Sequence, residues 1–143
     1  MAVVDLTTGK YPGNYGVEKE LLDEVVTLKR YIDSTVVPNG NVGLVASNYY
    51  RLFYYPANTF LLHVRTVTET VEGVADTVDI TDDETGTTVM ISNHDVNTDN
   101  AITESSAGKF KATSGYVCVR PDQAITVAKF WVVLQYVKLT TTD

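Results

Sequence analysis

The side chains best suited to covalent or acid–base chemistry are few and widely spaced in this sequence. Its 143 residues include two histidines, His63 and His94, and a single cysteine, Cys118. Asp95 follows His94, but a His-Asp pair does no catalysis without a nucleophile within reach. Cys118 lies in an apolar segment, which is typical of a small core residue. We therefore expect no catalytic residue and no enzyme activity.

A group of acidic residues is the best candidate for metal binding. A hard cation such as calcium needs several oxygen ligands that converge from a loop. The spacing here does not match an EF-hand, and Asp and Glu are common in exposed turns. A solvated turn is therefore the favoured interpretation, calcium is the alternative, and we expect no cofactor. The group consists of Asp76, Asp79, Asp82, Asp83 and Glu84.

Several other functions are disfavoured by charge and composition. The sequence has no Gly-rich phosphate loop, nucleophile elbow or zinc-binding helix motif. Its net charge of -7 would repel a phosphate backbone, so we expect no nucleic-acid partner. It has no apolar run of the roughly 20 residues that a membrane span requires, so we expect no membrane partner. The single cysteine and the lack of a secretory signal indicate synthesis in a reducing cytoplasm.

The elements that hold these residues are predicted to be strands. The chain contains 22 Val, 20 Thr and nine Tyr, and β-branched and aromatic residues favour a pleated, half-buried surface. Residues 1–16 have no periodic pattern and are expected to form an extended N-terminal arm that carries Tyr11 and Tyr15. Residues 17–143 are expected to form a single β-sandwich domain.

One segment fits either a helix or a strand. Apolar residues recur at helical spacing from Val17 to Ile32, but the second half also alternates like a strand. We expect a short helix near 17–24 and a strand near 25–35. Further strands are expected at 48–55, 59–71, 76–81, 87–92, 109–112, 115–120 and 125–139. The polar stretch 93–108 is expected to be an exposed loop.

Two of the predicted strands are apolar on both faces, although a sandwich strand needs only one apolar face. Either another part of the chain covers the second face, or that face contacts another protein, as surfaces rich in Tyr and Trp often do. The predicted contact residues on these strands are Tyr49, Phe53, Tyr55, Trp131, Val133 and Val137, to which the arm adds Tyr11 and Tyr15.

The order of motifs from 48 to 139 resembles the small jelly-roll capsid decoration, or cement, proteins of tailed bacteriophages. The motifs are YPANT at 55–59, VRTVTETV at 64–71, a TVDI strand with an acidic turn within 76–83, and FWVVLQY at 130–136. The acidic turn departs from the Gly-rich form expected in this class, which leaves the geometry of that loop open.

This resemblance implies a function and partners. It implies a jelly-roll sandwich, a homotrimer, and a virion protein on the capsid exterior that binds the major capsid protein and stabilises the shell. The alternative is a carbohydrate- or receptor-binding β-sandwich module of a phage tail or fibre, because many lectins share the sandwich fold.

Overall fold

The computed structural model describes residues 2–7, 25–86, 88–106 and 108–139. Within them it contains ten β-strands and one short 3-10 helix, so the predicted all-β class is confirmed. In chain order the elements are β1 (Val3–Asp5), β2 (Val25–Asp33), η1 (Ser34–Val36), β3 (Tyr49–Tyr55), β4 (Thr59–Thr70), β5 (Thr77–Thr81), β6 (Val89–Asp95), β7 (Ile102–Ser105), β8 (Lys109–Lys111), β9 (Gly115–Pro121) and β10 (Lys129–Lys138).

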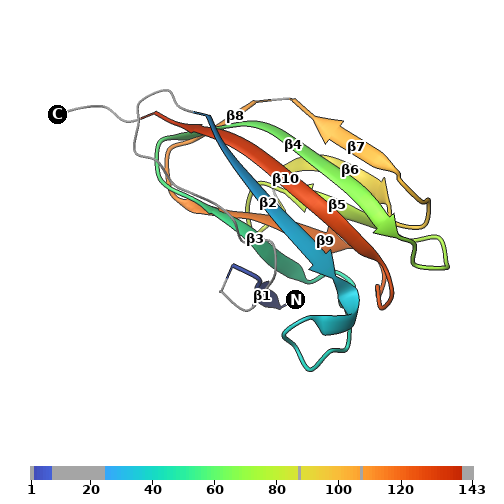
Figure 1. The fold of residues 1–143 in the computed structure, drawn as a ribbon. Helices are drawn as coiled ribbons and strands as arrows, with labels where there is room; N and C mark the ends of the chain where they lie inside the picture. Colours follow the sequence, from blue (N-terminus) through green and yellow to red (C-terminus); the bar gives the residue numbers. More distant parts are fainter. Residues whose placement is uncertain (1, 8–24, 87, 107, 140–143) are drawn as a thin grey trace.

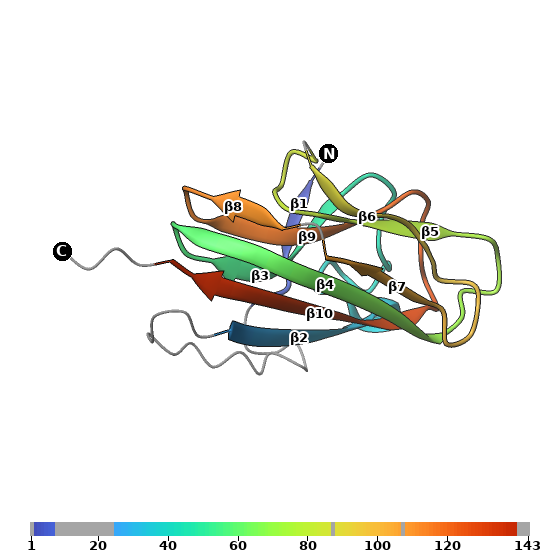
Figure 2. The same ribbon diagram turned by 90° about the horizontal axis from the view of Figure 1, so that it is seen from above.

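The strands form two sheets that pack face to face (Figures 1 and 2). The β9 sheet has the order β1-β3-β9-β5-β6, and the β10 sheet has the order β2-β10-β4-β7, with β8 also pairing with β4. All pairings are antiparallel except that of β1 with β3. Without β1 and β8, each sheet has four strands, and the chain crosses repeatedly between them. This is the strand order of a jelly roll, as the resemblance implied.

Strand β10 is the central strand of its sheet, and its inner face forms the middle of the core. It pairs with β2 on one side and β4 on the other along nearly its whole length. Its inner side chains Phe130, Val132, Leu134 and Tyr136 are at most 1% exposed. Each buried side chain of this size stabilises the fold by roughly 1.5–3 kcal/mol.

The segment that fitted either a helix or a strand forms strand β2. It pairs with β10 from Val25 with Val137 to Asp33 with Lys129. Arg30 of this strand points inward, and its Nη2 donates a hydrogen bond to the backbone oxygen of Leu52, at 3.2 Å. The helix expected near 17–24 lies outside the described residues.

Two strands were not predicted from the sequence. β1 lies within the expected arm, pairs in parallel with β3, and is followed by the fully buried Leu6. The prediction of a loop over 93–108 was wrong, because β6 extends to Asp95 and β7 occupies Ile102–Ser105. β7 is a short edge strand with Ile102 59% exposed, so its sequence lacks the inward apolar row that reveals most strands.

The final strand begins at Lys129, later than expected, because a carboxylate holds the preceding residues in a turn. Glu72 accepts hydrogen bonds from the backbone N–H groups of Thr126, Val127 and Ala128, at 3.0, 2.8 and 2.8 Å. Hydrogen bonds to an ionised acceptor are about twice as strong as neutral ones. Glu72 therefore fixes the direction in which the chain leads into β10.

A buried histidine links the two sheets. His94 lies in β6, not in the loop expected for it, and is 0% exposed. Its Nε2 is 2.8 Å from Thr68 Oγ1 on β4, and its Nδ1 is 2.8 Å from Thr103 Oγ1 on β7. Because the Thr68 hydroxyl donates to the backbone oxygen of Asp95, Nε2 carries the proton and donates to Thr68. Burial lowers the pKa of His94 to about 4, so the ring is neutral at pH 7.

We predict that acid destabilises the fold through His94. The unfolded imidazole takes up a proton near pH 6.5 and the folded one only near pH 4, so stability is lost as the pH falls through this window. The loss is expected to be on the order of 3 kcal/mol, and His94→Gln should remove this part of the pH dependence. Urea denaturation of both proteins between these pH values measures it. If the free energy of unfolding changed equally with pH in both proteins, the prediction would be contradicted.

Candidate protein-contact surface

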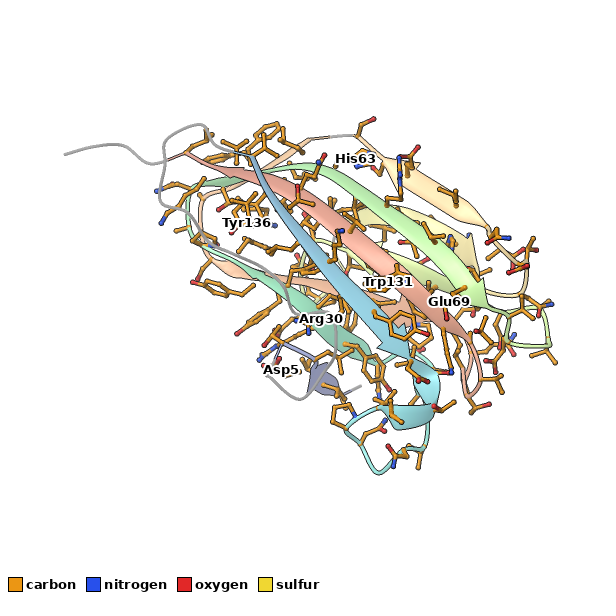
Figure 3. All side chains as sticks on the ribbon, viewed as in Figure 1. Asp5, Arg30, His63, Glu69, Trp131 and Tyr136 are labelled. Atoms are coloured by element: carbon orange, nitrogen blue, oxygen red, sulfur yellow. The ribbon has the colours of Figure 1, made fainter. Side chains whose placement is uncertain are left out.

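The outer face of the β10 sheet carries four rows of side chains that strand pairing sets side by side. Cross-strand neighbours on one face lie about 5 Å apart, so each row forms one contact group. Two rows at the ends are apolar, and two polar rows lie between them. We call these residues the contact face, which is turned toward the viewer in Figure 3. The rows are Tyr31-Trp131-Val67-Ile102, Lys29-Val133-Arg65-Glu104, Thr27-Gln135-His63 and Val25-Val137-Phe60-Phe110.

Trp131, the single tryptophan of the chain, lies on the contact face and is positioned by neighbouring side chains. The ring centroid of Trp131 is 4.9 Å from that of Tyr31, with the planes tilted by 44°. The Tyr31 hydroxyl donates to Glu69 Oε1 at 2.8 Å, and Figure 3 shows Trp131 and Glu69 at the same end of this face. An aromatic side chain that is already ordered loses little entropy when a partner packs on it.

Apolar side chains at both ends of the face are exposed to solvent. Ile102 is 59% exposed at one end, and Val25 and Phe110 are 48% and 53% exposed at the other. On β10, Trp131, Val133 and Val137 are part-buried. Apolar groups gathered on one face are typical of a protein-contact surface, and the role of the three β10 residues in such a contact stays a prediction.

Ion pairs cancel most of the charge within the face. Arg65 Nε donates to Glu104 Oε1 at 2.7 Å, and His63 Nε2 lies 3.3 Å from the same oxygen. The hydrogen bond from Arg65 lowers the pKa of Glu104 below its usual range. At the edge of the face, Lys129 Nζ is 3.7 Å from Asp33. The charged residues of the four rows are Lys29, Arg65 and Glu104, so a partner would meet a small positive charge here, although the whole chain carries -7.

Strand β3 does not present the second apolar face that its sequence suggested. Tyr49, Phe53 and Tyr55 are only 6%, 3% and 1% exposed. A register shift between Arg51 and Phe53 marks a β-bulge, which reverses the alternation of side chains beyond it. Phe53 and Tyr55 therefore point into the core beside Leu52. Their prediction as contact residues is corrected, because almost none of their surface is exposed.

The remaining predicted contact residues are Tyr49, Tyr11 and Tyr15. Tyr49 is covered on the outer side, where its hydroxyl lies so close to Gly86 that a Cβ there would meet it at 2.0 Å. It too has little surface for a partner. Tyr11 and Tyr15 lie outside the described residues.

Cys118 is buried, and burial raises the pKa of its thiol to about 12, so the thiol is not reactive at neutral pH.

The acidic group does not form one cluster. Asp76 precedes β5 and Asp82 follows it, at opposite ends of the strand. Asp79, between them, accepts a hydrogen bond from the backbone N–H of Asn93 at 2.8 Å. Among the described residues, no three His, Cys, Asp or Glu side chains are placed to hold a metal ion. No helix of the described segments is long and apolar enough to cross a membrane.

Comparison with known proteins gave matches in structure but not in sequence. No protein-family model matches the chain, and no curated protein matches it. A chain from the capsid of Ralstonia phage GP4 superposes with a TM-score of 0.61 and 13% identity, over 98% of this chain and 100% of that one. This chain has the fold of a phage capsid component.

Two further phage structures support the same fold assignment. A chain of the cyanophage Pam1 capsid asymmetric unit gives a TM-score of 0.59 and 15% identity, over 87% of this chain and 91% of that one. A chain of the acid-stable capsid of Helicobacter pylori bacteriophage KHP30 gives 0.57 and 12%, over 82% and 90%. At such identities the likeness concerns the fold, and the contact residues have to be tested directly.

We predict that the fluorescence of Trp131 reports contact with another subunit. Trp131 is the only tryptophan, so its emission has no background from other indoles. If the face self-associates, raising the protein concentration should shift the emission to the blue and reduce quenching by acrylamide, because water is excluded from the ring. Val137→Glu should abolish both changes, because it places an unpaired charge in the apolar row between Val25 and Phe60. Emission that is independent of concentration would argue against self-association through this face.

Proposed function

We propose that the chain is a virion structural protein that binds the outer surface of a phage capsid shell and stabilises it as a decoration, or cement, protein. The observation that carries this proposal is the match to a chain from a phage capsid over 98% of this chain and 100% of that one. The likeness spans the jelly roll from end to end and is not confined to one hairpin or sheet. The partner in this proposal is the major capsid protein.

The contact face supplies the kind of surface that such attachment requires. A cement protein has to bury apolar area against a neighbour and needs no chemistry. The two apolar rows of the face supply this area, and the ion pair of Arg65 with Glu104 between them lowers the cost of burying those two charges. Of the side chains best suited to chemistry, His94 and Cys118 are buried, and His63 lies beside Glu104 on the contact face.

We also propose that the chain acts as a homotrimer, with Tyr11 and Tyr15 of the N-terminal arm reaching a neighbouring subunit. Three linked copies engage the shell together, and after the first copy binds the others do so at a high effective concentration. Modest contacts made by each Trp131 and Val133 would then add up to durable attachment on the capsid exterior.

The alternative is a carbohydrate- or receptor-binding module of a tail or fibre. One observation favours a sugar ligand, namely a polar cleft beside Tyr116 that lies apart from the contact face. Saccharide binding and capsid attachment use different residues, so each can be tested without the other.

We predict that the purified chain co-sediments with capsid shells of the phage that encodes it and raises their melting temperature. Val137→Glu should weaken shell binding at least tenfold, a loss of about 1.4 kcal/mol or more, because the new carboxylate would be buried in an apolar row, where its cross-strand neighbours are Val25 and Phe60. Sedimentation measures binding, and light scattering on the free chain measures its oligomeric state.

The same substitution elsewhere on the surface provides the control. Val74 is 60% exposed and lies in the loop between β4 and β5, so Val74→Glu adds the same charge outside the contact face and should bind like the unmodified chain. A monomer that ignores the shells would refute the decoration role. Equal loss in both variants would show that charge alone, and not the contact face, governs attachment.

A further inference from the structure

A cleft of about 380 Å³ lies between the turn after β5 and the hairpin that joins β8 to β9. This volume falls within the range of small-ligand sites, roughly 300–1,000 Å³. None of its lining residues belongs to the contact face. The residues that matter for its chemistry are Tyr55, Glu84, Lys111, Thr113, Ser114 and Tyr116.

The floor of the cleft is rigid. Tyr55 is 1% exposed, and its hydroxyl donates to the backbone oxygen of Asp82 at 2.7 Å. Burial raises the pKa of Tyr55 well above its usual range, so the phenol keeps its proton. A Cβ on Gly115 would meet the Tyr55 hydroxyl oxygen at 2.6 Å. Glycine at this position therefore allows Tyr55 to pack at the base of the cleft.

Both cations around the cleft are already paired with carboxylates, and Asp83, which also lines the cleft, accepts hydrogen bonds from Thr85. Lys111 Nζ lies 3.2 Å from Oδ2 of Asp82, which is itself 1% exposed. Arg51 Nε donates to Glu84, and Arg51 Nη1 lies 3.4 Å from Asp5 Oδ2. Because each cation has a carboxylate partner, an anionic ligand would have to break these pairs. The cleft is better matched to a neutral, polar ligand.

Groups suited to such a ligand are placed on the walls. Thr113 and Ser114 are exposed, and neither hydroxyl bonds to another group among the described residues. Glu84 uses one oxygen for Arg51, and a carboxylate has further lone pairs that can accept hydrogen bonds. The walls thus offer both donors and acceptors within one small cleft.

An aromatic ring completes the cleft. The guanidinium of Arg51 sits 4.3 Å from the centroid of the Tyr116 ring, and the ring of Tyr54 meets it edge-on at 5.5 Å. These contacts hold Tyr116 in place beside the hydroxyls. A sugar has apolar C–H groups that pack on aromatic rings and hydroxyls that both donate and accept hydrogen bonds. We propose that this cleft binds a neutral saccharide.

The test uses the purified, full-length chain on an array of bacterial surface and mammalian glycans. We expect saturable binding to at least one uncharged glycan, followed by calorimetric titration with that glycan. Tyr116→Ala should weaken binding at least tenfold by removing the aromatic wall. Ser114→Tyr should do the same by filling the cleft, and it changes an exposed residue in the connection between β8 and β9.

A control variant shows whether the loss of glycan binding comes from filling the cleft or from adding a bulky side chain anywhere on the surface. Asp99→Tyr places the same bulky side chain at another exposed turn, between β6 and β7, and should leave glycan binding unchanged. No glycan bound above background would overturn the proposal, as would binding that Ser114→Tyr leaves intact. Salt-sensitive binding of a lysine-rich peptide in place of any glycan would also overturn it, in favour of a basic protein partner. Each of these results leaves the proposed capsid role standing, because that role rests on the match to a phage capsid chain and on the contact face, and not on the cleft.

Discussion

The fold depends on one strand that is apolar on both faces. β10 lies between β2 and β4, and its inner row fills the middle of the core. Its outer row, Trp131, Val133 and Val137, is left part-exposed by the described elements. The inner row explains why the sandwich is stable without a disulfide. The outer row gives the sheet a surface on which another protein can pack, so the strand that forms the core also defines the contact face.

Residues outside β10 fix where this strand begins and how it pairs with its neighbours. Glu72 accepts hydrogen bonds from three backbone N–H groups just before β10, and these bonds set where the strand begins. A register shift between Gln135 and Tyr136 adjusts the pairing of β10 with β4, so that Tyr136 points inward opposite Leu61 while His63 stays on the outer face. At the far side of the sandwich, His94 bridges β6 to β4 and β7 through hydroxyl groups. These polar contacts orient the sheets, and apolar burial supplies most of the stabilisation.

Much of the fold could be predicted from local pattern, because long alternating runs such as the one ending at Val137 have a clear period. The helix-or-strand question at 25–32 could not be decided locally, since β2 is fixed by a partner some 100 residues later in the chain. The burial of Phe53 and Tyr55 was missed because a β-bulge leaves no mark on composition. The polar edge strand β7 was missed because it buries little. The cleft beside Tyr116 brings together segments that are distant in sequence, and no motif marks it.

The account rests on the claim that the β10 sheet meets other subunits through its outer face. An electron-microscopy reconstruction of capsid shells carrying this chain tests that claim most directly. We expect the jelly roll on the outer surface of the shell, with Trp131 and Val133 buried against a neighbouring subunit. A reconstruction in which these side chains face solvent while the β9 sheet makes the contacts, or in which the chain is absent from the shell, would contradict it.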